Sequence, residues 1–302
     1  MVSNLDFSKS DFLWLTFRRS CFWRVIRFAG GMSLAKTTRP VSIVRIDGMA
    51  AAETREDAVA AEEPLEIRVG GHSVAVVMRT PGHDRELVAG FLVTEGLVKR
   101  REDVLDLIYC RNDGGKPEEN ILDVVLAPGA VVDVARLTRH VFTSSSCGIC
   151  SKASIDAVRM QFPAIPAPLT PRRAVLAALP DQLRAAQAAF AATGGLHASA
   201  LFDAEGRLQV VREDVGRHNG LDKVVGHAFF AEKLPLAGTI LLVSGRVSFE
   251  IMQKALAAGI PCVAAISAPT SAAVEFAQAS GQMLVGFLRG TRMNVYAGTL
   301  AD

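Results

Sequence analysis

The C-terminal half of the chain alternates short apolar segments with amphipathic ones, and this pattern restricts the fold more than any other feature. The segments 239–243, 261–266 and 283–288 are almost wholly apolar and have the length of strands, whereas 249–258 and 271–280 have helical spacing. A strand that is apolar on both sides must be covered on both faces, so we expect a sheet between layers of helices. Ligands of such sheets bind beyond the carboxyl ends of the strands.

The segments just upstream extend this pattern. An Ala-rich stretch over 181–193, followed by two glycines, is typical of a helix with a glycine stop. Strands are predicted over 197–202 and 208–212, and a polar loop with a helix over 213–227. Together these elements predict an α/β domain.

The N-terminal half has the pattern of a smaller α+β domain. Gly70 and Gly71 join two runs of alternating apolar and polar residues, which is a strong hairpin signal. Residues 84–94 place apolar side chains on one helical face, and Asp84 and Glu86 favour a helix start. The predicted elements are strands over 41–47, 65–69, 72–78, 104–110 and 121–126 and a helix over 84–94.

Four prolines between Pro163 and Pro171 prevent regular structure and indicate a linker between the two halves. A short helix is predicted just before them, over 152–162. The predicted divisions are a leader or extension over 1–40, a small α+β domain over 41–140, the CxxC loop with the short helix and the linker over 141–180, and the α/β domain over 181–302.

The first 40 residues differ in composition from the rest, because 12–28 is rich in aromatic and cationic residues. Arginines interrupt its apolar run, so it lacks the unbroken apolar core of a secretory signal. An amphipathic helix at a membrane interface is one interpretation. We favour a disordered tail or an upstream extension, with Met32 as an alternative start.

The composition limits the cellular compartment and the classes of binding partner that we expect for this chain. Five cysteines are scattered over 302 residues, which does not fit a disulfide-stapled secreted protein and favours the cytoplasm. A formal net charge of +2 gives no sign of a nucleic-acid partner. No apolar run reaches about 18 residues, so we expect no membrane-spanning helix.

Cys147 and Cys150 form the one CxxC of the chain. Structural zinc needs four ligands and His140 is the one nearby addition, so zinc within one chain is disfavoured, while zinc shared across a dimer stays open. A thioredoxin-type role needs a core strand just before the motif, but small polar residues precede it. An exposed loop suits sulfur transfer, and a helix start near residue 151 would lower the pKa of Cys147 and make it a nucleophile.

A charged loop follows the predicted strand over 208–212. It places seven ionisable groups in the twelve positions 212–223, at the end of the strand where ligands bind. Two glycines in it allow close backbone approach, whereas the alternative is a solvated surface turn. The residues expected to gather at the strand ends are Asp214, Arg217, His218, Asp222 and Lys223.

Two more loops lead from a strand into a helix, where free N–H groups attract anions. The segment 287–292 adds two guanidinium groups and an aromatic ring, which suit phosphates and a stacked base. A histidine that opens the strand over 197–202 is either a packed residue or a site residue. The further candidates from this edge are His197, Ser244, Arg246 and Thr270.

Taken together, these segments resemble the FdhD/NarQ family of sulfur carrier proteins for formate dehydrogenase. The resemblance covers about residues 41–299. It rests on the segments 79–87, 90–92, 95–96, 146–150, 193–198, 213–219, 244–246, 267–271 and 286–296.

The resemblance implies a cytoplasmic homodimer that takes persulfide sulfur from a cysteine desulfurase. The sulfur would pass to Mo-bis(molybdopterin guanine dinucleotide), or its tungsten analogue, before this cofactor enters the formate dehydrogenase catalytic subunit. The implied fold is a cytidine-deaminase-like three-layer α/β domain with a smaller N-terminal α+β domain and a flexible CxxC loop between them. No nucleic acid, membrane or protein-held metal is expected.

The resemblance also assigns residues. Cys147 matches the persulfide-bearing cysteine and Cys150 its partner in the motif. The cofactor-binding segment is matched by Phe287, Leu288, Arg289, Gly290, Thr291 and Arg292. The loop candidates that extend this site are His197, Asp214, Arg217, His218, Ser244, Arg246 and Thr270.

Two rival functions stay open, namely a cofactor chaperone that does not use its CxxC and a dithiol oxidoreductase. A zinc deaminase is disfavoured, because His197 is not followed by the glutamate of H-x-E, and Cys262 has no second cysteine three residues later.

Overall fold

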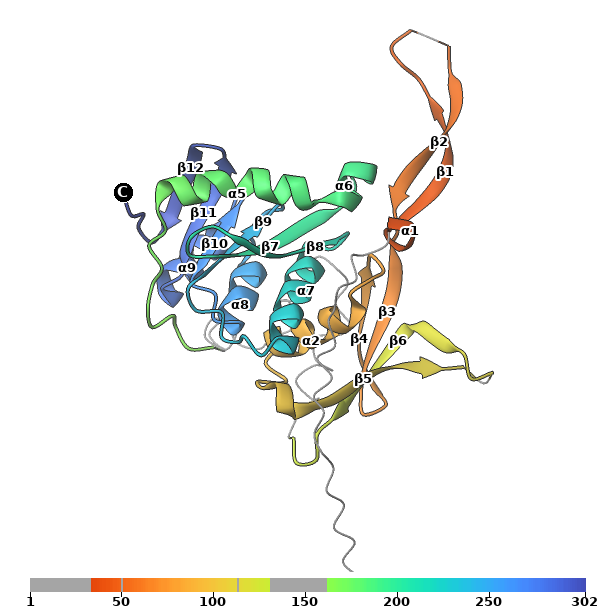
Figure 1. Cartoon of the computed structure of the whole chain (residues 1–302), viewed down its shortest axis with the longest axis horizontal. Coiled ribbons are helices and arrows are strands. Elements are labelled where there is room, and N and C mark those ends of the chain that lie inside the picture. Colours follow the sequence, from red (N-terminus) through yellow and green to blue (C-terminus); the bar gives the residue numbers. More distant parts are fainter. Residues whose placement is uncertain (1–33, 50, 113, 131–161) are drawn as a thin grey trace, which may run out of the picture. The chain divides into compact units, whose positions relative to one another are not determined.

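Six strands form the main sheet of the C-terminal half, in the order β12-β11-β10-β9-β7-β8 (Figure 1). The computed structural model describes residues 34–49, 51–112, 114–130 and 162–302. β9, β10 and β11 are parallel, while β7 runs antiparallel to β8 and β9, and β12 antiparallel to β11. The strands are β7 (His197–Asp203), β8 (Leu208–Asp214), β9 (Thr239–Val243), β10 (Cys262–Ala265), β11 (Met283–Arg289) and β12 (Arg292–Ala297).

Helices cover both faces of the main sheet, as predicted. Neighbouring residues of β9 face opposite sides of the sheet. Leu242 packs into the core on the α5 side, and Leu241 packs into the core on the side of α7, α8 and α9. Each fully buried leucine contributes about 1.5–3 kcal/mol, so both faces add to stability. The helices are α5 (Arg173–Ala186) on one face and α7 (Arg217–Phe230), α8 (Phe249–Ala257) and α9 (Ser271–Ser280) on the other.

A second sheet, in the order β4-β3-β6-β5, forms the smaller α+β part. Its inner face packs Leu65, Ile67 and Leu122 into the same core cluster as α2, and its outer face exposes Val76 and Met78. The predicted Gly-Gly hairpin is confirmed between β3 and β4. The elements are β3 (Glu63–Val69), β4 (His72–Arg79), α2 (Asp84–Thr94), the 3-10 helix η1 (Arg101–Asp103), β5 (Val104–Arg111) and β6 (Pro117–Leu126).

α2 crosses α7 so closely that each helix needs a glycine at the contact. A Cβ on Gly90 would overlap the carbonyl oxygen of Asp222, and a Cβ on Gly226 would overlap the carbonyl oxygen of Glu86. Residues four apart lie on one helix face, so the two contacts are reciprocal. This crossing joins the smaller sheet to the main sheet, and all described residues belong to one unit, Met32–Asp302.

Residues before position 41 have defined structure, contrary to the prediction of a leader that ends at residue 40. Leu34–Thr37 is the short helix α1, and β1 (Thr38–Arg45) pairs with β2 (Glu53–Ala60) as a two-stranded ribbon. The reason is backbone pairing, because the N–H of Ala61 donates to the carbonyl of Thr37 at 2.8 Å and Thr37 is fully buried.

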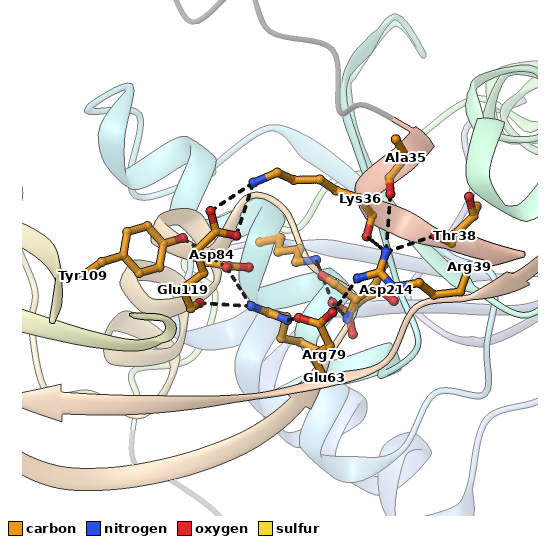
Figure 2. A network of polar contacts seen from close by, with 12 residues as sticks. Ala35, Lys36, Thr38, Arg39, Glu63, Arg79, Asp84, Tyr109, Glu119 and Asp214 are labelled. Carbon is orange, nitrogen blue, oxygen red and sulfur yellow. Dashed lines mark hydrogen bonds and ion pairs between the residues drawn. The ribbon is translucent and has the colours of Figure 1, made fainter. Parts of the chain in front are cut away.

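A polar network around Arg79 holds the smaller sheet together (Figure 2). The Arg79 guanidinium, 1% exposed, lies 3.2 Å from a carboxylate oxygen of Glu63 and 3.1 Å from one of Asp84. It also donates to the carbonyl of Glu119 at 3.2 Å, and the Tyr109 hydroxyl donates to Asp84 at 3.0 Å. The network links β3, β4, α2, β5 and β6, so Arg79 of the segment 79–87 has a structural role.

The elements of the C-terminal half need two corrections. The helix predicted over 181–193 begins eight residues earlier, at Arg173, and is interrupted at Gln187 before α6 (Ala188–Thr193). Pro180 lies inside α5 and removes one backbone hydrogen-bond donor from the helix. The buried side chains of Leu176, Leu179 and Leu183 hold the helix in place around it. The strand β12 was not predicted.

The short helix predicted over 152–162 lies almost wholly outside the described residues. In the part of the chain that the structure describes, no helix is both long enough and apolar enough to cross a bilayer.

Candidate functional site

A cleft of about 800 Å³ opens at the carboxyl ends of the parallel strands. Its size falls in the range of small-molecule sites, and its position is the one predicted from the α/β pattern. The cleft is lined by Pro180, Asp181, Leu183, Arg184, Gln187, Phe190, Gly194, Gly195, Leu196, His197, Ser244, Ile266, Leu288, Arg289 and Gly290.

His197 and Ser244 meet at this edge although 47 positions separate them. β7 runs antiparallel to β9, so the start of β7 lies beside the end of β9. The Ser244 hydroxyl accepts from the N–H of Ala198 at 2.9 Å, and the N–H of Ser244 donates to the Ala198 carbonyl at 2.9 Å. A Cβ on Gly245 would lie 3.2 Å from Nδ1 of His197, so glycine lets the loop approach the imidazole.

The surroundings of His197 favour the neutral form of its imidazole. Burial lowers the pKa of His197, the Arg217 charge lowers it further, and the Asp214 charge opposes the change. A neutral imidazole has one N–H donor and one acceptor nitrogen. At neutral pH the ring can therefore hydrogen-bond a ligand in the cleft without adding a positive charge.

A second wall of the cleft comes from the end of α5 and from α6. The guanidinium of Arg184 stacks over the Phe190 ring, 5.0 Å from its centroid. Gln187 lies between the two helices and is 6% exposed. This wall was not predicted, because an Ala-rich stretch carries no sequence signal for a break at Gln187.

Glu213 fixes this wall from the neighbouring strand β8. Its carboxylate accepts from the N–H of Ala189 at 3.0 Å and from the N–H of Phe190 at 2.7 Å. These are N–H groups of the first turn of α6, which a helix leaves without internal partners. Glu213 is 5% exposed and belongs to the charged loop of the sequence analysis, but it was not among the predicted site residues.

The hairpin of β11 and β12 carries the segment 287–292 and only part of it reaches the cleft. Leu288, Arg289 and Gly290 line the cleft. Phe287 has a positive φ of 53° at an irregularity in strand pairing, and its side chain is 41% exposed outside the cleft lining. The remaining two residues lie elsewhere: Thr291 borders a second hollow of about 430 Å³ with Arg173 and Asp302, and Arg292 is exposed.

Asp214 does not face the cleft. Its carboxylate lies 2.6 Å from the Lys223 ammonium, and both side chains are 0% exposed. It also accepts from the N–H of Gly216 at 2.8 Å and from the N–H of Thr80 at 3.1 Å. The predicted gathering at the strand ends is therefore wrong for Asp222 and Lys223, because Lys223 neutralises Asp214 in the interior and Asp222 pairs with Lys254 at 3.0 Å.

Arg217 and His218 open α7 beside the cleft but outside its lining. Nε2 of His218 lies 3.3 Å from a carboxylate oxygen of Glu250 and 3.5 Å from the Ser248 hydroxyl. Burial, with the charges of Arg217 and Lys254, lowers the pKa of His218 to about 3. His218 is thus a neutral residue between α7 and α8.

The last two loop candidates also lie outside the cleft lining. Arg246 is exposed, and the Thr270 hydroxyl accepts from the N–H of Ala273 at 3.3 Å as the N-cap of α9. Among the described residues, no three His, Cys, Asp or Glu side chains are grouped as a metal site.

Comparison with known proteins identifies the family. The model of the FdhD/NarQ family matches residues 60–300. The chain belongs to the FdhD/NarQ family. It is 55% identical over 256 residues to the sulfur carrier protein FdhD of Mycobacterium tuberculosis, which covers 82% of this chain and 92% of that protein. It is 52% identical over 273 residues to the sulfur carrier protein FdhD of Streptomyces avermitilis, which covers 88% and 95%.

A solved structure supports the fold. The chain is similar to a protein from Desulfotalea psychrophila described as a candidate formate dehydrogenase accessory protein, with a TM-score of 0.65 and 23% identity. The similarity covers 86% of this chain and 96% of that one. The mixed α/β architecture predicted from the sequence thus agrees with a solved structure.

The FdhD/NarQ match includes Cys147 and Cys150 in its span. Both cysteines lie outside the described residues, so their predicted role as sulfur-carrying thiols stays a prediction. Two cysteines of the described part, Cys110 and Cys262, are free, and burial raises the pKa of the Cys262 thiol to about 12. Cys262 is therefore an unreactive core residue.

Proposed function

We propose that this chain is a sulfur carrier that takes persulfide sulfur from a cysteine desulfurase on Cys147. The acceptor is the bis(molybdopterin guanine dinucleotide) cofactor of formate dehydrogenase, with molybdenum or tungsten, and the chain acts as a cytoplasmic homodimer. The observation that carries the proposal is the family match over 60–300, which contains the one CxxC of the chain. Relatives named sulfur carrier protein FdhD support it.

The transfer of sulfur from the donor persulfide to Cys147 needs no added oxidant. The Cys147 thiolate attacks the terminal sulfur of the donor persulfide, a new S–S bond forms at Cys147, and the donor cysteine leaves as a thiolate. Cys150 can then attack the inner sulfur of Cys147 and expel the outer sulfur as hydrosulfide to the acceptor. That step leaves a Cys147–Cys150 disulfide, which a cellular dithiol must reduce before the next cycle.

The cleft fits the nucleotide part of such an acceptor. Arg184 and Arg289 supply two cations for the phosphates of an anionic cofactor, and His197 and Ser244 supply neutral hydrogen-bonding groups.

The test uses two cysteine variants and two readouts. Cys147→Ala should abolish formate dehydrogenase activity in cells that depend on this chain, and should remove the persulfide that mass spectrometry detects after reaction with a desulfurase and cysteine. Cys110→Ala, which removes a half-buried thiol of β5, is the matched control and should keep both.

Two outcomes would refute the proposal in favour of its rivals. Full activity of folded Cys147→Ala would favour a chaperone that does not use its CxxC. A reversible Cys147–Cys150 disulfide with turnover of a protein disulfide substrate, and no persulfide, would favour a dithiol oxidoreductase.

A further inference from the structure

The ribbon of β1 and β2 has little cover from the rest of the described chain. It contacts α1 and α6 at its base, where a Cβ on Gly195 would lie 3.3 Å from the Cβ of Ala60. Every residue from Glu53 to Asp57 is exposed, so β2 is open to solvent on both faces at its far end. A pair of strands without a packed face is at best marginally stable in water, so a surface that packs on the ribbon would stabilise it.

The two faces of the ribbon differ in charge. Side chains alternate between the faces, and the strand pairing places Val44 beside Thr54 and Ser42 beside Glu56. Val44 is 62% exposed, and Glu56 is the one charged residue on its face. The opposite face carries Arg39, Arg45, Glu53, Arg55 and Asp57. The low-charge face consists of Pro40, Ser42, Val44, Thr54, Glu56 and Ala58.

The outer face of the smaller sheet is a second surface of the same kind. Val76 of β4 is 61% exposed, and Ile108 of β5 is 43% exposed. Glu66 and Arg68 of β3 pair with each other at 2.9 Å, so the charges that lie between these strands largely cancel. Nine of the eleven large apolar side chains that are exposed among the described residues belong to 34–108. Exposed apolar surface is therefore concentrated in the N-terminal half.

The chain holds these two surfaces in a fixed relation. The Arg39 guanidinium of β1 lies 2.6 Å from a carboxylate oxygen of Glu63, the first residue of β3. The N–H of Ala61, between β2 and β3, donates to the carbonyl of Thr37. The ribbon strands have eight residues each, and β3 and β4 have seven and eight, so the two surfaces match in length. Together they offer the roughly 20–30 residues per partner that a standard interface uses.

We infer that the low-charge face of the ribbon packs on the outer face of the smaller sheet in a second copy of this chain. A two-fold axis repeats the contact, so each copy gives its ribbon and receives that of the other. One symmetric dimer thus removes both apolar surfaces from water, which is favourable in proportion to the apolar area buried. The inference rests on the homodimer of the proposed function and adds the surfaces that form it.

Sedimentation of the full chain over a concentration series tests this arrangement. The wild type should be a dimer at about 10 µM, since interfaces of this size range from micromolar to picomolar in Kd. Val44→Asp on the ribbon and Val76→Lys on the sheet each place a charge in both contacts, so each should raise Kd by at least about a hundredfold. Both side chains are mostly exposed in one copy, so circular dichroism should show both variants folded.

A mixture of the two variants tests which surface meets which. Val44→Asp paired with Val76→Lys gives a heterodimer with one unmodified contact, and its other contact holds opposite charges. The mixture should therefore sediment as a dimer although each variant alone is a monomer. Val59→Asp is the matched control, because Val59 is 41% exposed on the charged face of the ribbon, opposite Arg39. It should dimerise as the wild type does.

The outcomes separate this inference from the proposed function. If the wild type is a dimer but Val44→Asp or Val76→Lys keeps its Kd within about threefold, the surfaces are wrongly assigned and the homodimer stands. A mixture that stays monomeric would overturn the packing of ribbon on sheet. If the wild type is a monomer even at about 100 µM, the inference and the homodimer both fail. Sulfur loading on Cys147, followed by mass spectrometry, is a separate readout in every case.

Discussion

The ammonium nitrogen of Lys223 lies 2.6 Å from a carboxylate oxygen of Asp214, and both side chains are 0% exposed. Lys223 also donates to the carbonyl of Thr80 at 2.9 Å, and Asp214 accepts from the N–H of Thr80. The pair therefore ties α7 and the end of β8 to the segment that leads into α2. These contacts place two segments of the family resemblance, 79–87 and 213–219, side by side.

Removing one member of this pair should destabilise the chain strongly. Lys223→Met leaves the Asp214 carboxylate buried without its counter-ion, and the loss is expected to be about 3–5 kcal/mol in free energy of unfolding. Urea denaturation at pH 7 measures it. Lys36→Met is the control, because Lys36 pairs with Glu119 while 60% exposed, and its loss should stay below about 1 kcal/mol. Equal losses in the two variants would contradict the structural role of the buried pair.

The close contact between α2 and α7 predicts that larger residues at its glycines lower the stability of the chain. Gly90→Ala and Gly226→Ala each place a methyl group on a backbone carbonyl of the other helix, so the helices must separate. We expect losses of about 2–4 kcal/mol in thermal or urea unfolding, as for other overpacked sites. Gly220→Ala in the same helix α7 has its nearest neighbour, the Ser199 hydroxyl, at 3.4 Å, and should be neutral or slightly stabilising.

Acidification should weaken the junction between α2 and β8. Burial, with the charge of Arg212, lowers the pKa of His83 from 6.5 to about 4. A folded-state pKa below the unfolded value means that the stability is complete above pH 6.5 and is lost as the pH falls towards 4. Protonation of Glu86 should also lower the stability on acidification, but at a lower pH. Burial raises the pKa of Glu86, and hydrogen bonds from Arg212 and His227 outweigh it and lower the pKa to about 2.

The measurement compares unfolding free energies at pH 7 and pH 5. Wild type should lose about 1–2 kcal/mol more than His83→Asn over this interval. Asparagine tolerates the positive φ of 57° at this position and does not titrate, so it isolates the imidazole. Parallel pH profiles for the two proteins would show that His83 is not the titrating group.

Much of the fold was predictable because its local signals agree with its packing. The helix over 84–94 and the helix over 271–280 were predicted with their observed bounds. The first has acidic residues in its first turn, and the second ends at Gly281 in the left-handed conformation. The apolar strand over 239–243 also matches β9, since a strand buried on both faces has no polar position.

The errors arose where a distant residue decides the local structure. The break at Gln187 depends on Glu213, which lies 23 and 24 residues beyond the two α6 N–H groups that it binds. β12 is an edge strand with mostly exposed residues, so its sequence lacks an apolar run. For the site, the strand ends bring His197, Ser244 and Arg289 together in the cleft lining. Asp214, which was predicted to lie in a loop, ends β8 and is buried in the interior.

Glu213 provides the last prediction, because it is the link between β8 and the cleft wall. Successive residues of a strand point to opposite faces, so Glu213 reaches α6 while Asp214 reaches α7. Glu213→Gln keeps the size of the side chain but replaces one acceptor oxygen with a donor amide that faces backbone N–H groups. The loss of this cap should cost about 1–2 kcal/mol in local stability of α6.

Hydrogen–deuterium exchange of a peptide that covers 188–195 measures this effect directly. Exchange there should speed up by about tenfold or more in Glu213→Gln, while peptides of β9 and β10 exchange as in the wild type. Glu205→Gln is the control, because Glu205 is 62% exposed in the turn between β7 and β8 and pairs only with Arg207 among the described ion pairs. If α6 kept its protection in Glu213→Gln, the wall would be held by the packing of Ala189 and Phe190 alone, and the carboxylate would have no positioning role.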